Sequence, residues 1–432
     1  MDRKLFAIVL LAMALRLVPL FAIMLNSGYG ALYQNDSDEY IAMGHALAEG
    51  DFLFSGQRAP WQPLFRTPGY PLFLAFFYAI GLPDAQVAFA QALLDAASCV
   101  LVFHLTMCIS RGKGQAYAAA ALFAANPLFM AYSFQLLSET FFLFVFLLAN
   151  IVFFGALRKE PFGPRDAALL GALFGFLILI RPASIAFPLI YALVIYAGGR
   201  SLRGPALLLG VSAIFVLAWM GRNYLVDGEF VLSGTALWNI VCYYAGFVAN
   251  DPASMLEGHG YTIWRYMLWD PARCTELPYA ELKSALVPAL ELIGDNALVF
   301  ARHSLIGWML LFDPFNPAGH IGGALSGMRP PDIERMMLSR SGEYLWFLPV
   351  YAFALAYQMS VYSLAAVHLW RPESRKGPLF LLFAMLLAYT FIANGPLNYA
   401  RYRFPIEPFI IVFASSGLWA IERCRRFLSC PG

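Results

Sequence analysis

Charged residues are scarce in this chain. They make up 13% of its 432 residues, while hydrophobic residues make up 60%. Ordinary soluble domains carry about 25% charged residues, so the composition excludes a soluble globular protein and indicates a membrane protein. The formal net charge of +2 argues against a nucleic-acid partner, because such proteins present strongly basic surfaces.

Several metal and nucleotide motifs are also lacking. The six cysteines form no C-x-x-C pair, and the six histidines are not spaced as zinc ligands. The chain has no G-x-x-x-x-G-K-[ST] loop that would cradle a nucleotide phosphate. Cys242 and Cys274 lie in one predicted external loop, and the sequence leaves open whether they form a disulfide.

What the chain has instead is a series of apolar runs, many of them near the ~20 residues that a membrane-spanning helix needs. The first run has no A-x-A cleavage site before Tyr29 and is therefore interpreted as a retained span. We predict an all-α polytopic bundle of about ten spans, with both termini in the cytoplasm. The predicted spans are 5–25, 85–109, 115–134, 138–157, 166–181, 182–198, 205–224, 343–369, 378–394 and 405–421.

The basic clusters fix the expected topology, because Lys and Arg favour cytoplasmic loops. Six clusters of basic residues flank the apolar runs. All six lie on the cytoplasmic side only if the apolar segments 67–82 and 296–312 do not cross the membrane. Both are therefore predicted to be interfacial or re-entrant helices on the outer face. Residues 1–432 then form a single transmembrane domain, with its main extracytoplasmic regions at 26–84 and 225–342.

Acidic residues collect at the predicted outer face. Asp36, Asp38 and Glu39 precede an amphipathic helical stretch, and Glu139 opens a later span. Asp36 is either a helix cap or a general base, while Asp38 and Glu39 are secondary candidates that also suit a solvated first helical turn. Glu139 is either a helix-start residue or the second member of a carboxylate pair. In such a pair, one acid accepts a proton from a hydroxyl and the other orients it or the substrate.

Arginines collect at the same predicted membrane edge, on the face that lacks the topological preference for basic residues. The planar guanidinium group suits phosphate recognition, although a single edge arginine is often only a snorkelling residue. Arg181 precedes Pro182 in a tight hairpin, and for it we predict a structural role. Asp95 lies mid-span and needs a polar partner that the sequence does not name. The candidate phosphate ligands are Arg58, Arg66, Arg222, Arg401 and Arg403.

These motifs resemble one enzyme family. The pattern D-x-x-x-Y over 36–40, the pattern R-x-P-G-Y-P over 66–71 and the segment ARYRFPIEP over 400–408 resemble the GT-C glycosyltransferases. The N-P pair at 126–127 and the S-E pair at 138–139 also fit. Closest are the bacterial members similar to dolichyl-phosphate-mannose protein mannosyltransferases, which include the aminoarabinose transferase that modifies lipid A.

The resemblance implies an inverting sugar transfer from a polyprenyl phosphate, such as undecaprenyl phosphate, to an extracytoplasmic acceptor. Asp36 matches the probable general base and Glu139 the second acid. Arg66 is expected on the donor phosphate, with Tyr40 and Tyr70 as further substrate-binding candidates. The implied location is the bacterial cytoplasmic (inner) membrane, with the active site facing the periplasm.

The resemblance leaves the cofactor and the acceptor open. No cofactor is required by the sequence, but a divalent cation held by Asp36, Asp38 and Glu139 stays an alternative. Relatives that modify proteins or lipid A carry a larger soluble C-terminal domain, whereas this chain stops at Gly432. The acceptor is therefore a glycan, a lipid or a protein, and the sugar is not identified.

Two other functions are alternatives to this one. A transporter or flippase of lipid-linked sugars is expected to show internal repeats and broken helices with a site near the midplane, whereas here the polar residues gather at one face. An O-antigen polymerase or ligase is also outward-facing, but it usually lacks an early acidic loop.

Overall fold

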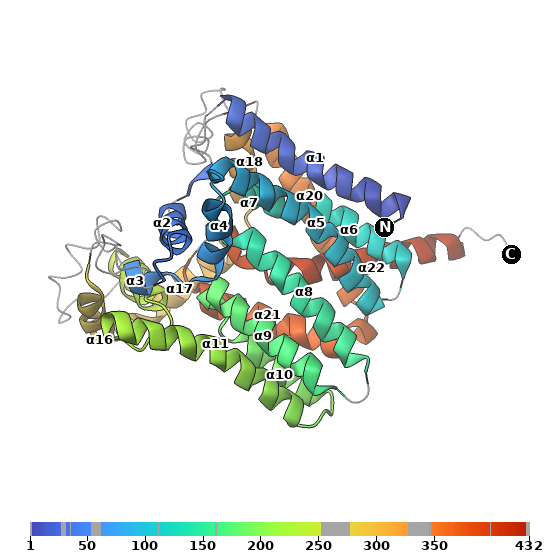
Figure 1. Ribbon diagram of the computed structural model, residues 1–432. Helices are drawn as coiled ribbons and strands as arrows, with labels where there is room; N and C mark the ends of the chain where they lie inside the picture. The colour runs from blue at the N-terminus through green and yellow to red at the C-terminus, as the bar shows by residue number, and fades with distance from the viewer. Residues whose placement is uncertain are drawn as a thin grey trace.

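The structure is a computed structural model of the full chain. It describes residues 2–26, 32–34, 36–52, 62–110, 112–159, 162–251, 277–326, 345, 347–397 and 399–428. Within these ranges the regular structure is entirely helical, and they contain no strand (Figure 1). The predicted all-α fold class is confirmed.

Long apolar helices form the frame of the bundle. Among the described residues, five helices are long and apolar enough to cross a membrane, or six if one bent pair counts as a single span. That pair is α16 (Tyr279–Asp295) and α17 (Ala297–Leu310), which meet at an angle of 91°. The predicted count of about ten spans is not confirmed. The five helices are α1 (Arg3–Asn26), α5 (Asp84–Ser110), α8 (Glu139–Leu157), α11 (Arg203–Asp227) and α20 (Leu348–Leu369).

The remaining predicted spans are also helical, with one correction. The stretch 115–134 is broken into α6 (Lys113–Ala124) and α7 (Pro127–Ser133). Asn126 causes the break: its backbone is extended before Pro127, and its side chain accepts hydrogen bonds from the first amides of α7. The other shorter helices are α9 (Pro164–Ile180), α10 (Phe187–Ala197), α21 (Pro378–Asn394) and α22 (Glu407–Leu428).

Short helices gather at the end of the bundle opposite the two termini (Figure 1). Among them, α4 has 11 residues and is about 16 Å long at 1.5 Å per residue, half of the ~30 Å hydrocarbon layer. It therefore fits the interfacial helix predicted for 67–82. The short elements are α2 (Ser37–Ala48), α3 (Gln62–Phe65), α4 (Gly69–Ala79), α12 (Thr235–Trp238), η3 (Asn239–Tyr244), α13 (Ala245–Ala249) and α18 (Phe315–Ser326).

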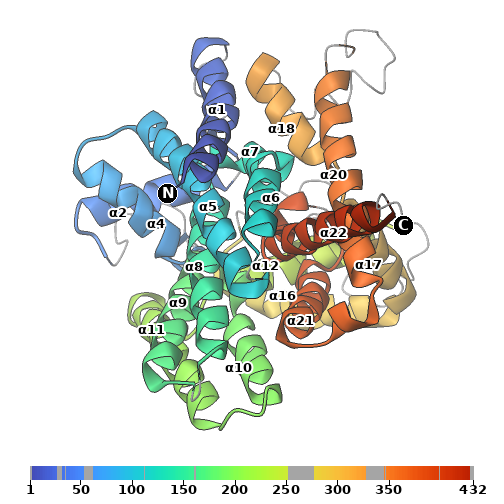
Figure 2. The ribbon, with the colours of Figure 1, turned by 90° about the vertical axis from the view of Figure 1, so that its right-hand side faces the viewer.

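The helices form groups around the central α5 and α8. Figure 2 shows α9, α10 and α11 at one edge of the molecule and α1, α18 and α20 at the opposite edge. In the part of the chain that the structure describes, three short turns connect or flank the shorter helices, and two of them lie at the candidate site. These turns are η2 (Pro182–Ser184), η5 (Pro372–Arg375) and η6 (Ala400–Arg403).

A buried ion pair joins α1 to α5. Arg16 donates from Nε to Asp95 Oδ2 at 2.5 Å, and both side chains are almost fully buried. The same guanidinium group donates to the carbonyl oxygens of Phe123 and Ala124, at the C-terminal end of α6. Asp95 therefore has Arg16 as the partner that the sequence left unnamed. One cation thus holds three helices together.

Replacing Arg16 by Met tests this role. The variant leaves the Asp95 carboxylate buried without a counter-charge, which is expected to cost about 3–5 kcal/mol and to lower the melting temperature of the purified protein in detergent. The double variant Arg16→Met/Asp95→Leu removes both charges and should recover most of the loss. A single variant that melts like the native protein would contradict the role of this pair.

Candidate active site

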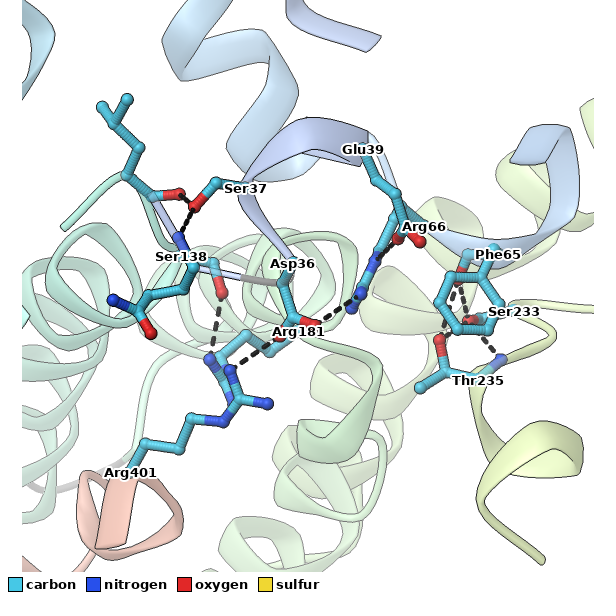
Figure 3. Close-up of polar contacts among 12 residues, drawn as sticks. Asp36, Ser37, Glu39, Phe65, Arg66, Ser138, Arg181, Ser233, Thr235 and Arg401 are labelled. Atoms are coloured by element: carbon cyan, nitrogen blue, oxygen red, sulfur yellow. Dashed lines mark hydrogen bonds and ion pairs between the residues drawn. The ribbon is translucent and has the colours of Figure 1, made fainter. Parts of the chain in front are cut away.

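The first loop folds back onto the start of α8. Ser37 Oγ donates to the Leu136 carbonyl at 3.0 Å and accepts from the Gln34 amide at 2.9 Å. The Leu136 amide donates to the Leu32 carbonyl at 2.9 Å. These bonds hold the beginning of α2 against the segment that precedes α8 (Figure 3). Asp36 is thereby placed beside the first turn of α8.

Asp36 stands at the start of α2 without making the side-chain hydrogen bond of a helix cap. Its carboxylate is bound by two guanidinium groups instead. Oδ1 accepts from Arg66 at 2.9 Å, and Oδ2 accepts from Arg401 at 2.7 Å (Figure 3). The acid is therefore part of an ion-pair cluster, as expected of a site residue, and does not satisfy the helix end.

Arg66 bridges two acids at the start of α2. Besides Asp36, it pairs through Nε with Glu39, and its guanidinium group lies 5.0 Å from the centre of the Tyr40 ring. Asp38 points elsewhere and is exposed. Of the three acids in the first loop, the structure thus brings Asp36 and Glu39 into the cluster.

Gly69 sets the position of α4 against α9. A Cβ atom at this glycine would lie 2.6 Å from the backbone of Leu179 and Ile180, the last residues of α9. Only a residue without a side chain permits this approach. The R-x-P-G-Y-P motif, which begins at Arg66, thus packs against the end of α9. Arg181 is the residue that directly follows this helix end.

Arg181 enters the site because α9 ends at a proline. Pro182 disfavours a helical conformation at the residue before it, and Arg181 is extended (φ −142°, ψ 106°). Its NH1 group donates to Ser138 Oγ at 3.0 Å and lies 2.5 Å from Glu139 Oε1. A structural role was the prediction for Arg181, whereas the structure brings this residue into contact with the candidate acid Glu139. An arginine before a proline at the outer edge was the available signal.

Arg401 connects the two acids. It lies on η6, and its NH1 group is 2.7 Å from Asp36 Oδ2 and 3.6 Å from Glu139 Oε1. Its Nε is buried and has no hydrogen-bond partner in the described structure. The result is a series of alternating charges, which we call the ion-pair chain: Glu39, Arg66, Asp36, Arg401, Glu139 and Arg181.

Glu139 is the most buried acid of the ion-pair chain, with 1% of its side chain exposed. Its contacts with Arg181 and Arg401 are ion pairs without hydrogen-bond alignment, and the NH1 group of Arg181 donates to Ser138. Neither carboxylate oxygen has a hydrogen-bond donor in the described structure. A buried acceptor of this kind is well suited to bind a ligand donor group.

A small pocket, partly open to solvent, lies at the Arg181–Arg401 end of the ion-pair chain. Apart from the two arginines, its walls are mainly aromatic and aliphatic, and they come from α8, η2, α10, α21 and the segment after η6. The apolar lining includes Phe142, Ala183, Phe187, Tyr389, Ala393 and Phe404.

The pKa values of the two acids at the start of α2, Asp36 and Glu39, are shifted in opposite directions. Burial alone would raise the pKa of the Asp36 carboxyl, but Arg401 and Arg66 outweigh burial and hold this pKa well below its usual range. At Glu39, burial outweighs the attraction of Arg66, so the pKa of its carboxyl is raised. Asp36 is therefore a weak base as long as both arginines bind it.

Other predicted site residues lie apart from the ion-pair chain. Arg403 is buried near Gln358 (3.3 Å) and Glu407 (3.9 Å). Tyr70 is buried and donates to Gln91 at 2.6 Å, although its ring contacts Tyr40 edge-on. Arg222 is half-buried on α11, beside Asn223 and 4.8 Å from the Trp219 ring. Arg58 falls outside the described residues.

The alternative metal site is not assembled in the part of the chain that the structure describes. There, no group of three or more His, Cys, Asp or Glu side chains is arranged to hold a metal ion. Asp36 and Glu139 are held by arginines, and Asp38 is exposed. Cys242 is disulfide-bonded, and Cys274, for which the sequence left a disulfide with Cys242 open, lies outside the described residues.

The fold and the site define a multi-pass α-helical membrane protein with a charged site at one end of its bundle. Residues 65–221 match the family described as dolichyl-phosphate-mannose-protein mannosyltransferase. The match confirms the resemblance to the GT-C family over these residues, which include Arg66, Glu139 and Arg181. A search of curated proteins found no match.

Comparison with solved structures gave distant similarities. The apo oligosaccharyltransferase of Archaeoglobus fulgidus is 16% identical with a TM-score of 0.49, over 98% of this chain and 51% of that chain. The same organism's AglB, in complex with an inhibitory peptide and a dolichol-phosphate, is 14% identical with a TM-score of 0.49, over 99% and 52%. ArnT from Cupriavidus metallidurans is 14% identical with a TM-score of 0.38, over 95% and 76%. This chain spans about half the length of the archaeal chains.

Replacing Gly69 by Ala tests the close contact between α4 and α9. The added methyl group has no space against the α9 backbone, and overpacking of this kind costs about 1–3 kcal/mol. We expect a lower melting temperature for Gly69→Ala. Gly155→Ala is the matched control, because a Cβ atom there meets nothing within 4 Å. Equal melting temperatures for the two variants would rule out the contact.

Proposed function

We propose that this protein is a membrane glycosyltransferase that moves a sugar from a polyprenyl phosphate to a hydroxyl group of an extracytoplasmic acceptor. The observation that carries the proposal is the ion-pair chain at the mouth of an apolar pocket. It combines a candidate base with arginines suited to a phosphate. The family match over 65–221 supports the same class of reaction.

The pocket suits a lipid phosphate better than a soluble one. Its two guanidinium groups, Arg181 and Arg401, offer a site for the phosphate. The apolar walls next to them offer a surface for the first prenyl units. Arg66 contacts the opposite oxygen of Asp36 and does not line the pocket. We therefore assign the donor phosphate to Arg181 and Arg401, and we assign Arg66 to holding Asp36 and Glu39.

Asp36 is the proposed general base. In the transfer step, its carboxylate takes the proton of the acceptor hydroxyl, and the acceptor oxygen bonds to the anomeric carbon. The bond between this carbon and the phosphate oxygen breaks, and the polyprenyl phosphate leaves with the electron pair. The arginines stabilise the charge that develops on the leaving phosphate. A single displacement of this kind inverts the anomeric centre.

Glu139 is the proposed sugar-orienting acid. Its buried oxygens have no hydrogen-bond donor in the described structure, and it contacts both arginines that we assign to the phosphate. Hydroxyl groups of a donor sugar would supply the missing donors. Binding the sugar this way fixes the anomeric carbon relative to the phosphate and to Asp36.

The site is proposed to face the periplasm across a bacterial cytoplasmic membrane. The short helices lie at one end of the bundle, and both termini lie at the other (Figure 1). Asp36 and Glu39 are at the start of α2, and Arg66 directly follows α3, so part of the ion-pair chain belongs to these short helices. Basic loops at 111–113, 158–165 and 200–203 suit the cytoplasmic side. The proposed partners are thus a polyprenyl-phosphate sugar, an acceptor outside the cytoplasm and the surrounding lipid.

The function is tested by mass spectrometry of surface glycans and lipids from cells with and without the protein. We expect products that differ by one sugar, and Asp36→Asn should reduce their formation about 10²- to 10⁴-fold, the usual contribution of a general base. Asp166→Asn is the matched control, because Asp166 pairs with Lys159 at the opposite end of α9 from Arg181. Identical glycans and lipids in both cell types would contradict the proposed function, while full activity of Asp36→Asn would contradict only the base assignment.

A further inference from the structure

Arg401 belongs to two sites at once. Its NH1 group binds Asp36 Oδ2 at 2.7 Å, while the same side chain lines the apolar pocket beside Arg181. Its Nε is buried without a hydrogen-bond partner in the described structure. One guanidinium group is thus shared between the candidate base and the proposed phosphate position, and one of its donors is unused.

A phosphate in the pocket would compete with Asp36 for Arg401. A phosphate has more charge and more acceptor oxygens than a carboxylate, and the guanidinium fork binds it through two parallel hydrogen bonds. Such binding would use the idle Nε together with a terminal N–H group. Asp36 would still accept a hydrogen bond from Arg66 at Oδ1. It would therefore stay in place after losing its contact with Arg401.

We propose that Arg401 couples donor binding to the activation of Asp36. Without a donor, Arg401 holds Asp36 as an inert carboxylate. A donor phosphate bound between Arg181 and Arg401 draws the guanidinium group away from Asp36, so that the acid accepts a proton only when a sugar donor is present. This coupling rests on the proposed function and assigns Arg401 as the residue that orders the reaction.

The coupling sets the order of donor binding and acceptor activation. Burial alone would raise the pKa of Asp36, but its contacts with Arg401 and Arg66 hold this pKa low. Loss of one of these cations moves the pKa back toward its usual range. The proton of the acceptor hydroxyl then passes to Asp36 as the new glycosidic bond forms and the bond to phosphate breaks. After release of the product, the proton goes to water and Arg401 rebinds Asp36. The donor therefore binds before the acceptor is activated.

Donor affinity gives the first test. Farnesyl phosphate is titrated by calorimetry into the purified full chain in nanodiscs, with farnesol as the uncharged comparison. Asp36→Asn removes the internal competitor for Arg401 and should bind farnesyl phosphate about three- to tenfold more tightly than the native protein. Asp38→Asn, the same change at an exposed position of α2, should stay within about twofold. Equal affinity of the two variants, or weaker binding by Asp36→Asn, would overturn the coupling.

A second test uses the native chain and so does not depend on the folding of a variant. Carbodiimide and glycinamide modify a carboxyl group faster when fewer guanidinium groups hold it, and peptide mass spectrometry locates the product. Farnesyl phosphate should increase modification of Asp36 several-fold, and farnesol should not. Unchanged modification of Asp36 in saturating farnesyl phosphate would overturn the coupling.

The same titrations separate this inference from the function on which it rests. If the native protein binds farnesyl phosphate and Arg181→Gln and Arg401→Gln weaken binding, the proposed donor site stands. Failure of Asp36→Asn to tighten binding would then contradict the coupling alone. If the native protein binds farnesyl phosphate no better than farnesol, the donor site and the coupling both fail.

Discussion

The contact of Arg401 with both Asp36 and Glu139 is the interaction on which the site depends. Two carboxylates so close together in a buried setting would repel each other and be costly to ionise without a cation between them. Arg401 supplies that cation from a position 365 residues along the chain from Asp36. The first loop must fold back, α9 must end at Arg181 and η6 must turn at Arg401 for the charges to alternate.

The scaffold fixes Arg401 through a second buried polar cluster. Two residues further on, Arg403 turns to the other side of η6, toward Gln358 and Glu407. Glu407 in turn accepts hydrogen bonds from Asn126 at 3.0 Å and Tyr362 at 2.8 Å. The break before α7 and the start of α22 are thus tied to the turn that carries Arg401. Arg403 supports the site from behind and does not line the pocket at its mouth.

Much of this arrangement was predictable from local pattern. Charge in an apolar chain and the positive-inside rule placed Asp36, Glu139, Arg66 and Arg401 at one predicted face, and the structure brings these four together. The all-α class follows from the same apolar runs. The sequence pattern does not predict to which side of a turn a side chain points. Arg401 and Arg403 are two residues apart and diverge.

For Arg181, too, local pattern did not predict which way the side chain points. Its position before Pro182 predicted a hairpin, which is correct, but the extended backbone at this residue also directs its side chain to Ser138 and Glu139. The close approach of α4 to the end of α9 at Gly69 is likewise a tertiary contact, which neither helix predicts alone. An experimental structure of the protein with farnesyl phosphate tests the proposed coupling most directly. We expect the phosphate between Arg181 and Arg401, with Arg401 beyond hydrogen-bond distance of Asp36. A phosphate bound elsewhere, with the Arg401–Asp36 pair intact, would contradict the coupling.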